Sequence, residues 1–139
     1  MSASSRQPVV LILVGSKSDE GKMAPALDML DKAEVPYEFT VSSAHRDPDR
    51  TAELARSAKA RGIKVIIAGA GLSAALPGAV SALTDLPVIG VPFASGPLNG
   101  LDALFAIAQL PSGVPVGTVG IDNAKNAAAL AIRILNLAT

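Results

Sequence analysis

Five short runs of Val, Ile and Leu recur along the chain at similar intervals, and this alternation constrains the fold more than any other feature. The runs span residues 9–14, 35–41, 65–68, 88–91 and 114–119. Most of them contain few polar residues, as is typical of strands buried on both faces of a parallel sheet. Between the runs lie segments long enough to return the chain to the start of the next strand.

These intervening segments have the properties of helices. Met23, Leu27 and Leu30 recur at helical spacing, and Asp47 followed by Pro48 is typical of a helix start. Further helices are expected over residues 51–61, 76–83, 101–108 and 124–137. Strand and helix therefore alternate five times, which predicts an α/β fold: a three-layer α/β/α sandwich around a parallel five-stranded sheet of flavodoxin-like strand order. We expect a single domain over residues 1–139, with residues 1–7 flexible.

Composition excludes several classes of protein. The 139 residues carry 12 Lys and Arg against 12 Asp and Glu, so no net charge draws the chain toward nucleic acid or anionic lipid. There is no cysteine and only one histidine, so we expect neither a disulfide nor a dedicated metal site. No run approaches the ~18 apolar residues of a membrane span, and residues 1–8 do not resemble a leader. We expect a cytoplasmic protein that binds neither nucleic acid nor membrane.

The charged residues are unevenly distributed. Of the 24, 19 lie within the first 64 residues, and the last three predicted helices have mostly apolar or Ala-rich outward faces. Apolar patches of that size are uncommon on soluble monomers. The sequence therefore predicts a homo-oligomer in which these helices contact other subunits.

Three loops that follow predicted strands carry the candidate functional residues, because ligands of such sheets bind beyond the carboxyl ends of the strands. The first loop is Gly15-Ser16-Lys17-Ser18-Asp19, whose glycine turn, hydroxyls and backbone N–H groups suit a phosphate or a ribose. The alternative is a simple glycine turn with Ser18 or Asp19 capping the next helix. It is not a Walker loop, because the second glycine and the GK[ST] ending are absent.

The second loop, residues 42–48, contains the only histidine, His45, beside Arg46. The unperturbed pKa of a histidine, ~6.5, allows it to donate and accept protons near neutrality, as a general acid and base must. Arg46 offers a planar fork for a phosphate or carboxylate. The alternative is a solvated histidine with Arg46 paired to Asp47 or Asp49.

The third loop, residues 68–78, consists almost entirely of small residues. Small residues let backbone N–H groups approach a ligand closely, although tight packing of helix on strand would also require them. The loop at residues 92–100 is rich in Pro and Gly and could wall a pocket. Asp122 and Asn123 are expected to cap the last helix.

Several of these motifs together resemble a known family. GSKSDE, SSAHRDP, AGAG followed by ALPG, LPVIGVP, QLPSGVPVGTVGI and NAAALAIRIL are similar, in this order, to the N5-carboxyaminoimidazole ribonucleotide mutase and aminoimidazole ribonucleotide carboxylase family of purine biosynthesis. The resemblance runs from residue 9 to about residue 137. It implies a flavodoxin-like domain, a homo-octamer with active sites between subunits, a small-molecule ribonucleotide as substrate, and no metal or organic cofactor.

The resemblance also implies roles for individual residues. The catalytic proton shuttle would be His45. The remaining residues would bind the substrate: its phosphate and ribose at Ser16, Ser18, Asp19 and Arg46, its imidazole at Ser43 and Ala44, and its mobile carboxyl group at Ala70, Gly71, Leu72, Ser73 and Ala74.

The chain departs from the mutase pattern in the third loop. Mutases of this family carry GGAAHLPG, whereas this chain has GLSAALPG, with Leu72 and Ala75 in place of a glycine and a histidine. Ser73 and Ala75 partly match the GRSNALSG of the carboxylase branch, while Leu76 to Gly78 match the mutases. We expect a mutase. The alternatives are a carboxylase that uses free CO2, a related carboxylase of another nucleotide such as a nicotinate-type dinucleotide, and a non-catalytic nucleotide-binding module. A further C-terminal helix typical of mutases is expected to be missing after Thr139.

Overall fold

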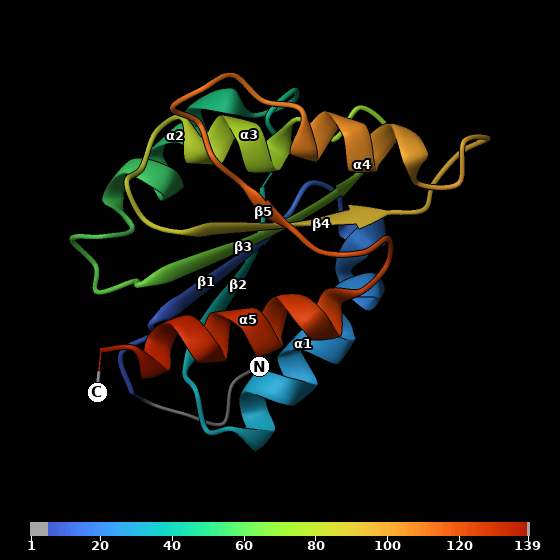
Figure 1. The fold of residues 1–139 in the computed structure, drawn as a ribbon. Coiled ribbons are helices and arrows are strands. Elements are labelled where there is room, and N and C mark those ends of the chain that lie inside the picture. Colours follow the sequence, from blue (N-terminus) through green and yellow to red (C-terminus); the bar gives the residue numbers. More distant parts are fainter. Residues whose placement is uncertain (1–5, 139) are drawn as a thin grey trace.

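Five parallel strands form one sheet in the computed structural model, which describes residues 6–138 (Figure 1). The strands are β1 (Val10–Val14), β2 (Tyr37–Val41), β3 (Val65–Gly71), β4 (Val88–Phe93) and β5 (Gly117–Thr118). Their order across the sheet is β2-β1-β3-β4-β5, and every neighbouring pair is parallel. This is the flavodoxin-like order that the alternation of the sequence predicts.

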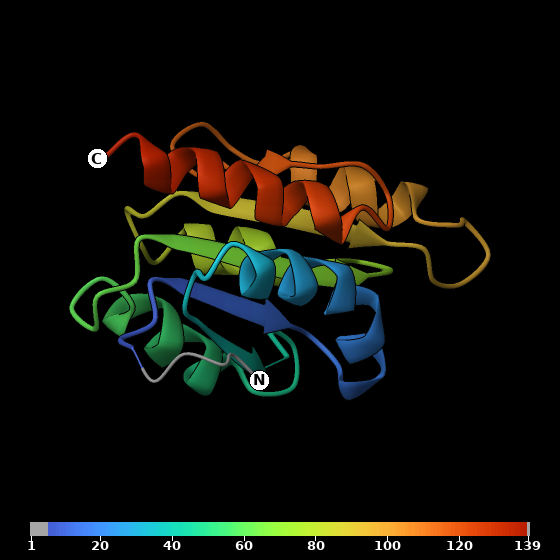
Figure 2. The ribbon, with the colours of Figure 1, turned by 90° about the horizontal axis from the view of Figure 1, so that it is seen from below.

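Helices cover both faces of the sheet and complete three layers. They are α1 (Glu20–Lys32), α2 (Pro48–Ser57), α3 (Leu76–Ser81), α4 (Leu101–Ala108) and α5 (Ala124–Asn136), and a 3-10 turn, η1 (Lys17–Asp19), precedes α1. Figures 1 and 2 show α1 and α5 side by side on one face, with α2, α3 and α4 on the other. None of the helices within residues 6–138 combines the length and the apolar composition needed to cross a bilayer.

Alanine determines how closely the α5 layer packs. Ala124, Ala127, Ala128 and Ala131 lie on one face of α5 and are completely buried against the sheet and α1. Side chains of this size let the backbone of α5 approach its neighbours closely, so a well-packed core forms with few aromatic residues. The alanine content of the sequence is thus a packing feature of this layer.

The lengths of β3 and β5 differ most from the expectation. β3 continues to Gly71, because Ala70 and Gly71 keep their register with Pro92 and Phe93 of β4. β5 has only two residues instead of the six expected over 114–119, because the pairing with β4 is confined to Gly117 and Thr118. The longer β3 brings small residues to the carboxyl edge of the sheet, where the candidate site lies.

The structure adds detail at the chain start, and further boundaries of the expected elements are shifted. Arg6 and Gln7 donate side-chain hydrogen bonds to the carbonyls of Glu34 and Arg61, and residues 1–5 of the segment expected to be flexible lie outside the described residues. β2 begins two residues later than expected, at Tyr37, and α2 ends at Ser57 instead of residue 61. The bounds of α4 are as predicted.

Candidate active site

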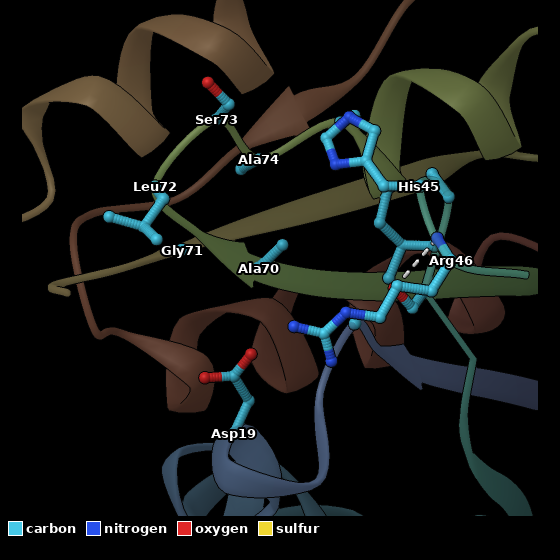
Figure 3. Close-up of a pocket in the computed structure, with 13 residues that line it drawn as sticks. Asp19, His45, Arg46, Ala70, Gly71, Leu72, Ser73 and Ala74 are labelled. Carbon is cyan, nitrogen blue, oxygen red and sulfur yellow. Dashed lines mark hydrogen bonds between the residues drawn. The ribbon is translucent and has the colours of Figure 1, made fainter. Parts of the chain in front are cut away.

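A cavity of about 390 Å³ opens at the carboxyl edge of β1, β2 and β3 (Figure 3). It is lined by loops that follow all three strands, as expected for a ligand site of such a sheet. The lining residues are Gly15, Asp19, Ser43, Ala44, His45, Arg46, Ala70, Gly71, Leu72, Ser73, Ala74, Ala75 and Leu76. The structure therefore brings together all the predicted site residues except Ser16 and Ser18.

Ser16 and Ser18 shape the first loop from beside the cavity. The Oγ atoms of these two serines lie 2.7 Å apart, and Oγ of Ser16 accepts a hydrogen bond from the backbone N–H of Ser18. Ser16 thereby caps η1, and Asp19, at the start of α1, makes no side-chain capping hydrogen bond. The carboxylate of Asp19 consequently points into the cavity.

Asp19 lies in an unusual electrostatic environment. Partial burial raises the pKa of its carboxyl above the ordinary 3.8, and the nearby cation of Lys22 opposes this shift without cancelling it. Nζ of Lys22 donates a hydrogen bond of 2.6 Å to the carbonyl of Ala94 and lies 5.6 Å from the centre of the Phe93 ring. Lys22 thus connects α1 with the end of β4.

The second loop is a tight turn that presents His45 and Arg46. Within it, the N–H of Asp47 donates to the carbonyl of Ser43, and the N–H of Arg46 donates to Oγ of Ser43 at 3.3 Å. Asp47 begins α2 as predicted, because its Oδ1 accepts a hydrogen bond from the N–H of Arg50. Below the turn, the buried hydroxyls of Ser42 and Thr51 lie 2.9 Å apart and hold the loop to α2.

Arg46 is available to a ligand. Its guanidinium extends toward Asp19 across the cavity in Figure 3, and no carboxylate within residues 6–138 forms an ion pair with it. The predicted alternative, a pairing of Arg46 with Asp47 or Asp49, is therefore not found. His45 is exposed at the same end of the cavity.

The third loop supplies the opposite end of the cavity and has almost no polar side chains. Gly69 permits the close approach of β3 to its surroundings, since a Cβ there would lie 2.6 Å from the Phe93 ring. Beyond Gly71 the chain turns sharply at Leu72, whose φ is +55°, and the N–H of Ala74 donates to the carbonyl of Leu72 at 2.8 Å. Ala74 is buried, and Ala75 precedes α3. Gly69 thus serves packing, as one of the two expectations for this loop has it, and the residues that follow line the cavity.

Sequence reasoning missed several contributors. Gly15, Ala75 and Leu76 complete the lining of the cavity. Their positions in the first and third loops are the sequence feature that could have identified them. Lys22 was missed because its partner, Ala94, is 72 residues away. Asn123 caps α5 as predicted, whereas Asp122 does not: its Oδ1 accepts a hydrogen bond of 2.9 Å from the N–H of Ala94.

The chemistry of the cavity is simple. It offers one imidazole, one guanidinium, one carboxylate and a wall of backbone and small side chains. Nowhere in residues 6–138 do three His, Cys, Asp or Glu side chains gather as metal ligands would. A guanidinium opposite a carboxylate suits an anionic, hydroxylated molecule, and the imidazole can carry a proton. Fold and site together define an α/β protein of flavodoxin-like topology with a small-molecule cavity at the carboxyl edge of its sheet.

Comparisons with known proteins identify the particular family. Residues 9–139 match the family model described as AIR carboxylase. An N5-carboxyaminoimidazole ribonucleotide mutase of Pyrococcus horikoshii is 57% identical over 137 residues, 99% of this chain and 77% of the relative. A phosphoribosylaminoimidazole carboxylase of Schizosaccharomyces pombe is 57% identical over 128 residues, 92% of this chain but 23% of the relative. A crystal structure of Treponema denticola PurE superposes with a TM-score of 0.84 at 32% identity, covering 94% of this chain and 81% of that one. The chain belongs to the AIR carboxylase family.

Proposed function

We propose that this protein is an N5-carboxyaminoimidazole ribonucleotide mutase, an isomerase of purine biosynthesis that moves a carboxyl group from the exocyclic nitrogen of the substrate to C4 of the imidazole. The observation that carries the proposal is the 57% identity to the Pyrococcus horikoshii mutase over 99% of this chain. The cavity agrees with it, because one proton carrier and one anion-binding cation converge on a wall of small residues.

The reaction requires one proton to be delivered and one to be removed. Breaking the N–C bond of the carbamate releases CO2, and the nitrogen takes up a proton. C4 then forms a bond to the carbon of CO2 and loses its own proton, so that the protons balance over the cycle. A single base can perform both transfers, and His45 is the only imidazole in the chain. The reaction as proposed needs no cofactor.

The other residues of the cavity bind and enclose the substrate in this proposal. Arg46 would hold the phosphate as a charge-assisted donor, and Asp19 would accept hydrogen bonds from the ribose. Ser16 and Ser18 would contribute from the neighbouring turn, and Ser43 and Ala44 would lie against the imidazole. Ala70, Gly71, Leu72, Ser73 and Ala74 would form the pocket in which CO2 remains between the two steps. A small pocket lined by backbone keeps a neutral gas molecule near C4.

A second candidate is the direct carboxylation of aminoimidazole ribonucleotide by free CO2. The Schizosaccharomyces pombe relative carries that name, and Ser73 and Ala75 stand where the mutase pattern has Ala and His. This chain covers only 23% of that larger relative, so the mutase remains the main proposal.

One pair of assays separates the candidates. The purified protein receives either carboxyaminoimidazole ribonucleotide without bicarbonate or aminoimidazole ribonucleotide with bicarbonate, and the rates of 4-carboxy product formation are compared. A mutase is faster in the first assay at equal substrate concentration. Faster turnover in the second assay would establish the carboxylase instead. Nucleotide binding without turnover of either substrate would leave a non-catalytic binding module.

We further propose a homo-octamer that works in the cytoplasm. Support for an assembly comes from apolar side chains left exposed on α4 and the preceding loop, Leu98, Leu101 and Phe105. Light scattering on the purified protein tests the assembly through its mass.

A further inference from the structure

Two loops of the protein meet beside the cavity, and their contact involves a side chain that the family pattern does not have. Leu72 of the third loop extends away from His45 in Figure 3. Its Cδ2 lies so near Gly96, in the loop between β4 and α4, that a Cβ on Gly96 would be 2.7 Å from it. A Cβ on Gly71 would likewise lie 2.9 Å from Cβ of Ser95. The two loops are therefore packed together at two successive positions.

The backbone of Leu72 adopts a conformation that leucine normally avoids. Its φ of +55° lies in the left-handed region, where a residue with a Cβ is less stable than glycine by roughly 1 kcal/mol or more. Half of the residue is exposed, and burial of the other half stabilises it by about 1 kcal/mol, which is similar to the strain. Such strain persists only where surrounding contacts hold the residue in place. The contact of Leu72 with Gly96 is one such contact.

The partner loop is firmly fixed where it leaves the sheet. The N–H of Ala94 donates to Oδ1 of Asp122, and the carbonyl of Ala94 accepts a hydrogen bond from Nζ of Lys22. Ala94 is thus held from both sides, by α1 and by the loop before α5. Ser95 and Gly96 follow directly, so the surface against which Leu72 packs is anchored to the body of the domain.

We infer that Leu72 is a positioning residue which, through its contact with Gly96, holds residues 71–75 as the wall of the pocket that retains CO2 during turnover. The inference rests on the proposed mutase function. Leu72 both lines the cavity and contacts the anchored loop, so it couples the wall to a rigid part of the domain. Without its side chain the turn would keep its hydrogen bond but lose this contact, and the wall would open more often.

The test measures how much CO2 leaves the site before it is recaptured. The full chain converts unlabelled carboxyaminoimidazole ribonucleotide in buffer that contains ¹³C-bicarbonate and carbonic anhydrase, and mass spectrometry gives the ¹³C fraction of the 4-carboxy product. Rates without enzyme are subtracted. Leu72→Ala keeps the Cβ, and with it the strain of the positive φ, but removes the side-chain contact with Gly96. We expect it to raise the ratio of labelled to unlabelled product about fivefold, the factor that corresponds to about 1 kcal/mol in the opening equilibrium. Leu72→Met, which keeps an apolar side chain of similar size, should restore most of the retention.

Gly96→Ala tests the same contact from the other side. The added methyl group displaces Leu72 and also strains the backbone of Gly96, whose φ is +74°. The labelled fraction should therefore rise at least as much as it does for Leu72→Ala. In the double variant the two effects should not add, because they remove one contact. Leu137→Ala, which truncates a leucine at the exposed end of α5, serves as the control and should retain CO2 like the unaltered protein.

The outcomes distinguish this inference from the proposed function. No formation of 4-carboxy product from the carboxyamino substrate by the unaltered protein would overturn the mutase proposal and the retention role with it. Turnover by both proteins with an equal labelled fraction in Leu72→Ala would overturn the role of Leu72 alone. A product that is already fully labelled with the unaltered protein would also overturn it, since nothing would then be retained.

Discussion

At the scale of single residues, the position of His45 predicts how substitutions of this residue act. The imidazole is exposed at the cavity, opposite the wall formed by residues 70–75, and the turn below it is held by Ser43 and Asp47 instead of by the histidine itself. The hydrogen bonds that hold this turn thus do not depend on the side chain of His45, to which the proposed function assigns the proton transfers. Substitutions at this position should affect turnover and leave stability nearly unchanged.

His45→Asn keeps a polar side chain of similar volume but removes the group that carries the proton. We expect kcat to fall by at least about 100-fold, in the range of general acid and base effects, with substrate affinity and melting temperature changed little. Steady-state kinetics, isothermal titration calorimetry and a thermal melt measure the three quantities. Asp49→Asn, also exposed but outside the cavity, is the matched control. Wild-type turnover in His45→Asn would remove this residue from the mechanism.

Asp19 predicts a dependence of stability on pH. Burial raises the pKa of its carboxyl in the folded protein. The contribution of this group to the free energy of unfolding is therefore largest below the ordinary pKa of 3.8, and it is lost as the pH rises through the raised pKa. At pH 7 the ionised carboxylate of Asp19 therefore lowers the stability of the fold.

Asp19→Asn should remove that cost. We expect a melting temperature about 1 to 3 °C above that of the unaltered protein at pH 7, with the difference vanishing below pH 3.8, and a raised KM for the substrate. Thermal melts across the pH range measure the first effect, again with Asp49→Asn as the control. A lower melting temperature at pH 7 would show that the attraction to Lys22 outweighs the burial of Asp19.

At the scale of helices and strands, glycines at two positions should respond to the same substitution in opposite ways. A Cβ on Gly69 of β3 would lie 2.6 to 2.8 Å from ring atoms of Phe93 and from Cε of Met23, whereas one on Gly21 of α1 would meet no atom within 4 Å. Gly69→Ala should lower the free energy of unfolding by about 1 to 3 kcal/mol. Gly21→Ala should raise it by up to about 1 kcal/mol, because alanine favours the helix. Urea denaturation of both variants measures these changes, and a neutral Gly69→Ala would show that β3 has room to spare.

The strands and helices also show what the sequence can predict. The Val and Ile runs predict β1 and β4, because a strand that is buried on both faces has a continuous apolar sequence. The apolar period predicts α4, because a helix that is buried on one face repeats its apolar residues at helical spacing. Their order places the loops after β1, β2 and β3 at one edge, so most residues of the cavity could be named beforehand.

The features of the structure that the sequence does not predict depend on contacts between distant segments. The hydrogen bond from Lys22 to Ala94 joins α1 to the end of β4, and Leu72, with its positive φ, packs against Gly96 of another loop. β5 is short because only Gly117 and Thr118 pair with β4, although the run of residues 114–119 has the composition of a longer strand. Local composition carries no information about such pairings.

At the scale of the whole molecule, the exposed apolar side chains of α4 predict self-association. Leu101 and Phe105 are four residues apart, so they share one face of the helix, and they are 50% and 59% exposed. Covering them in a second copy of the chain removes this apolar surface from water, which favours assembly. The charged surface around α2 and the turn that follows it, by contrast, is well solvated as it stands.

Light scattering coupled to size exclusion should therefore give a mass several times that of the 14.0 kDa chain, with eight copies as the proposed number. Phe105→Glu places a charge where another subunit would pack, so the mass should fall and turnover should fall with it if the site is completed between subunits. Ala60→Glu adds the same charge at an exposed position between Lys59 and Arg61 and should leave the mass unchanged. A mass near 14 kDa for the unaltered protein would contradict the assembly, because the exposed leucine and phenylalanine of α4 would then face water in the working enzyme.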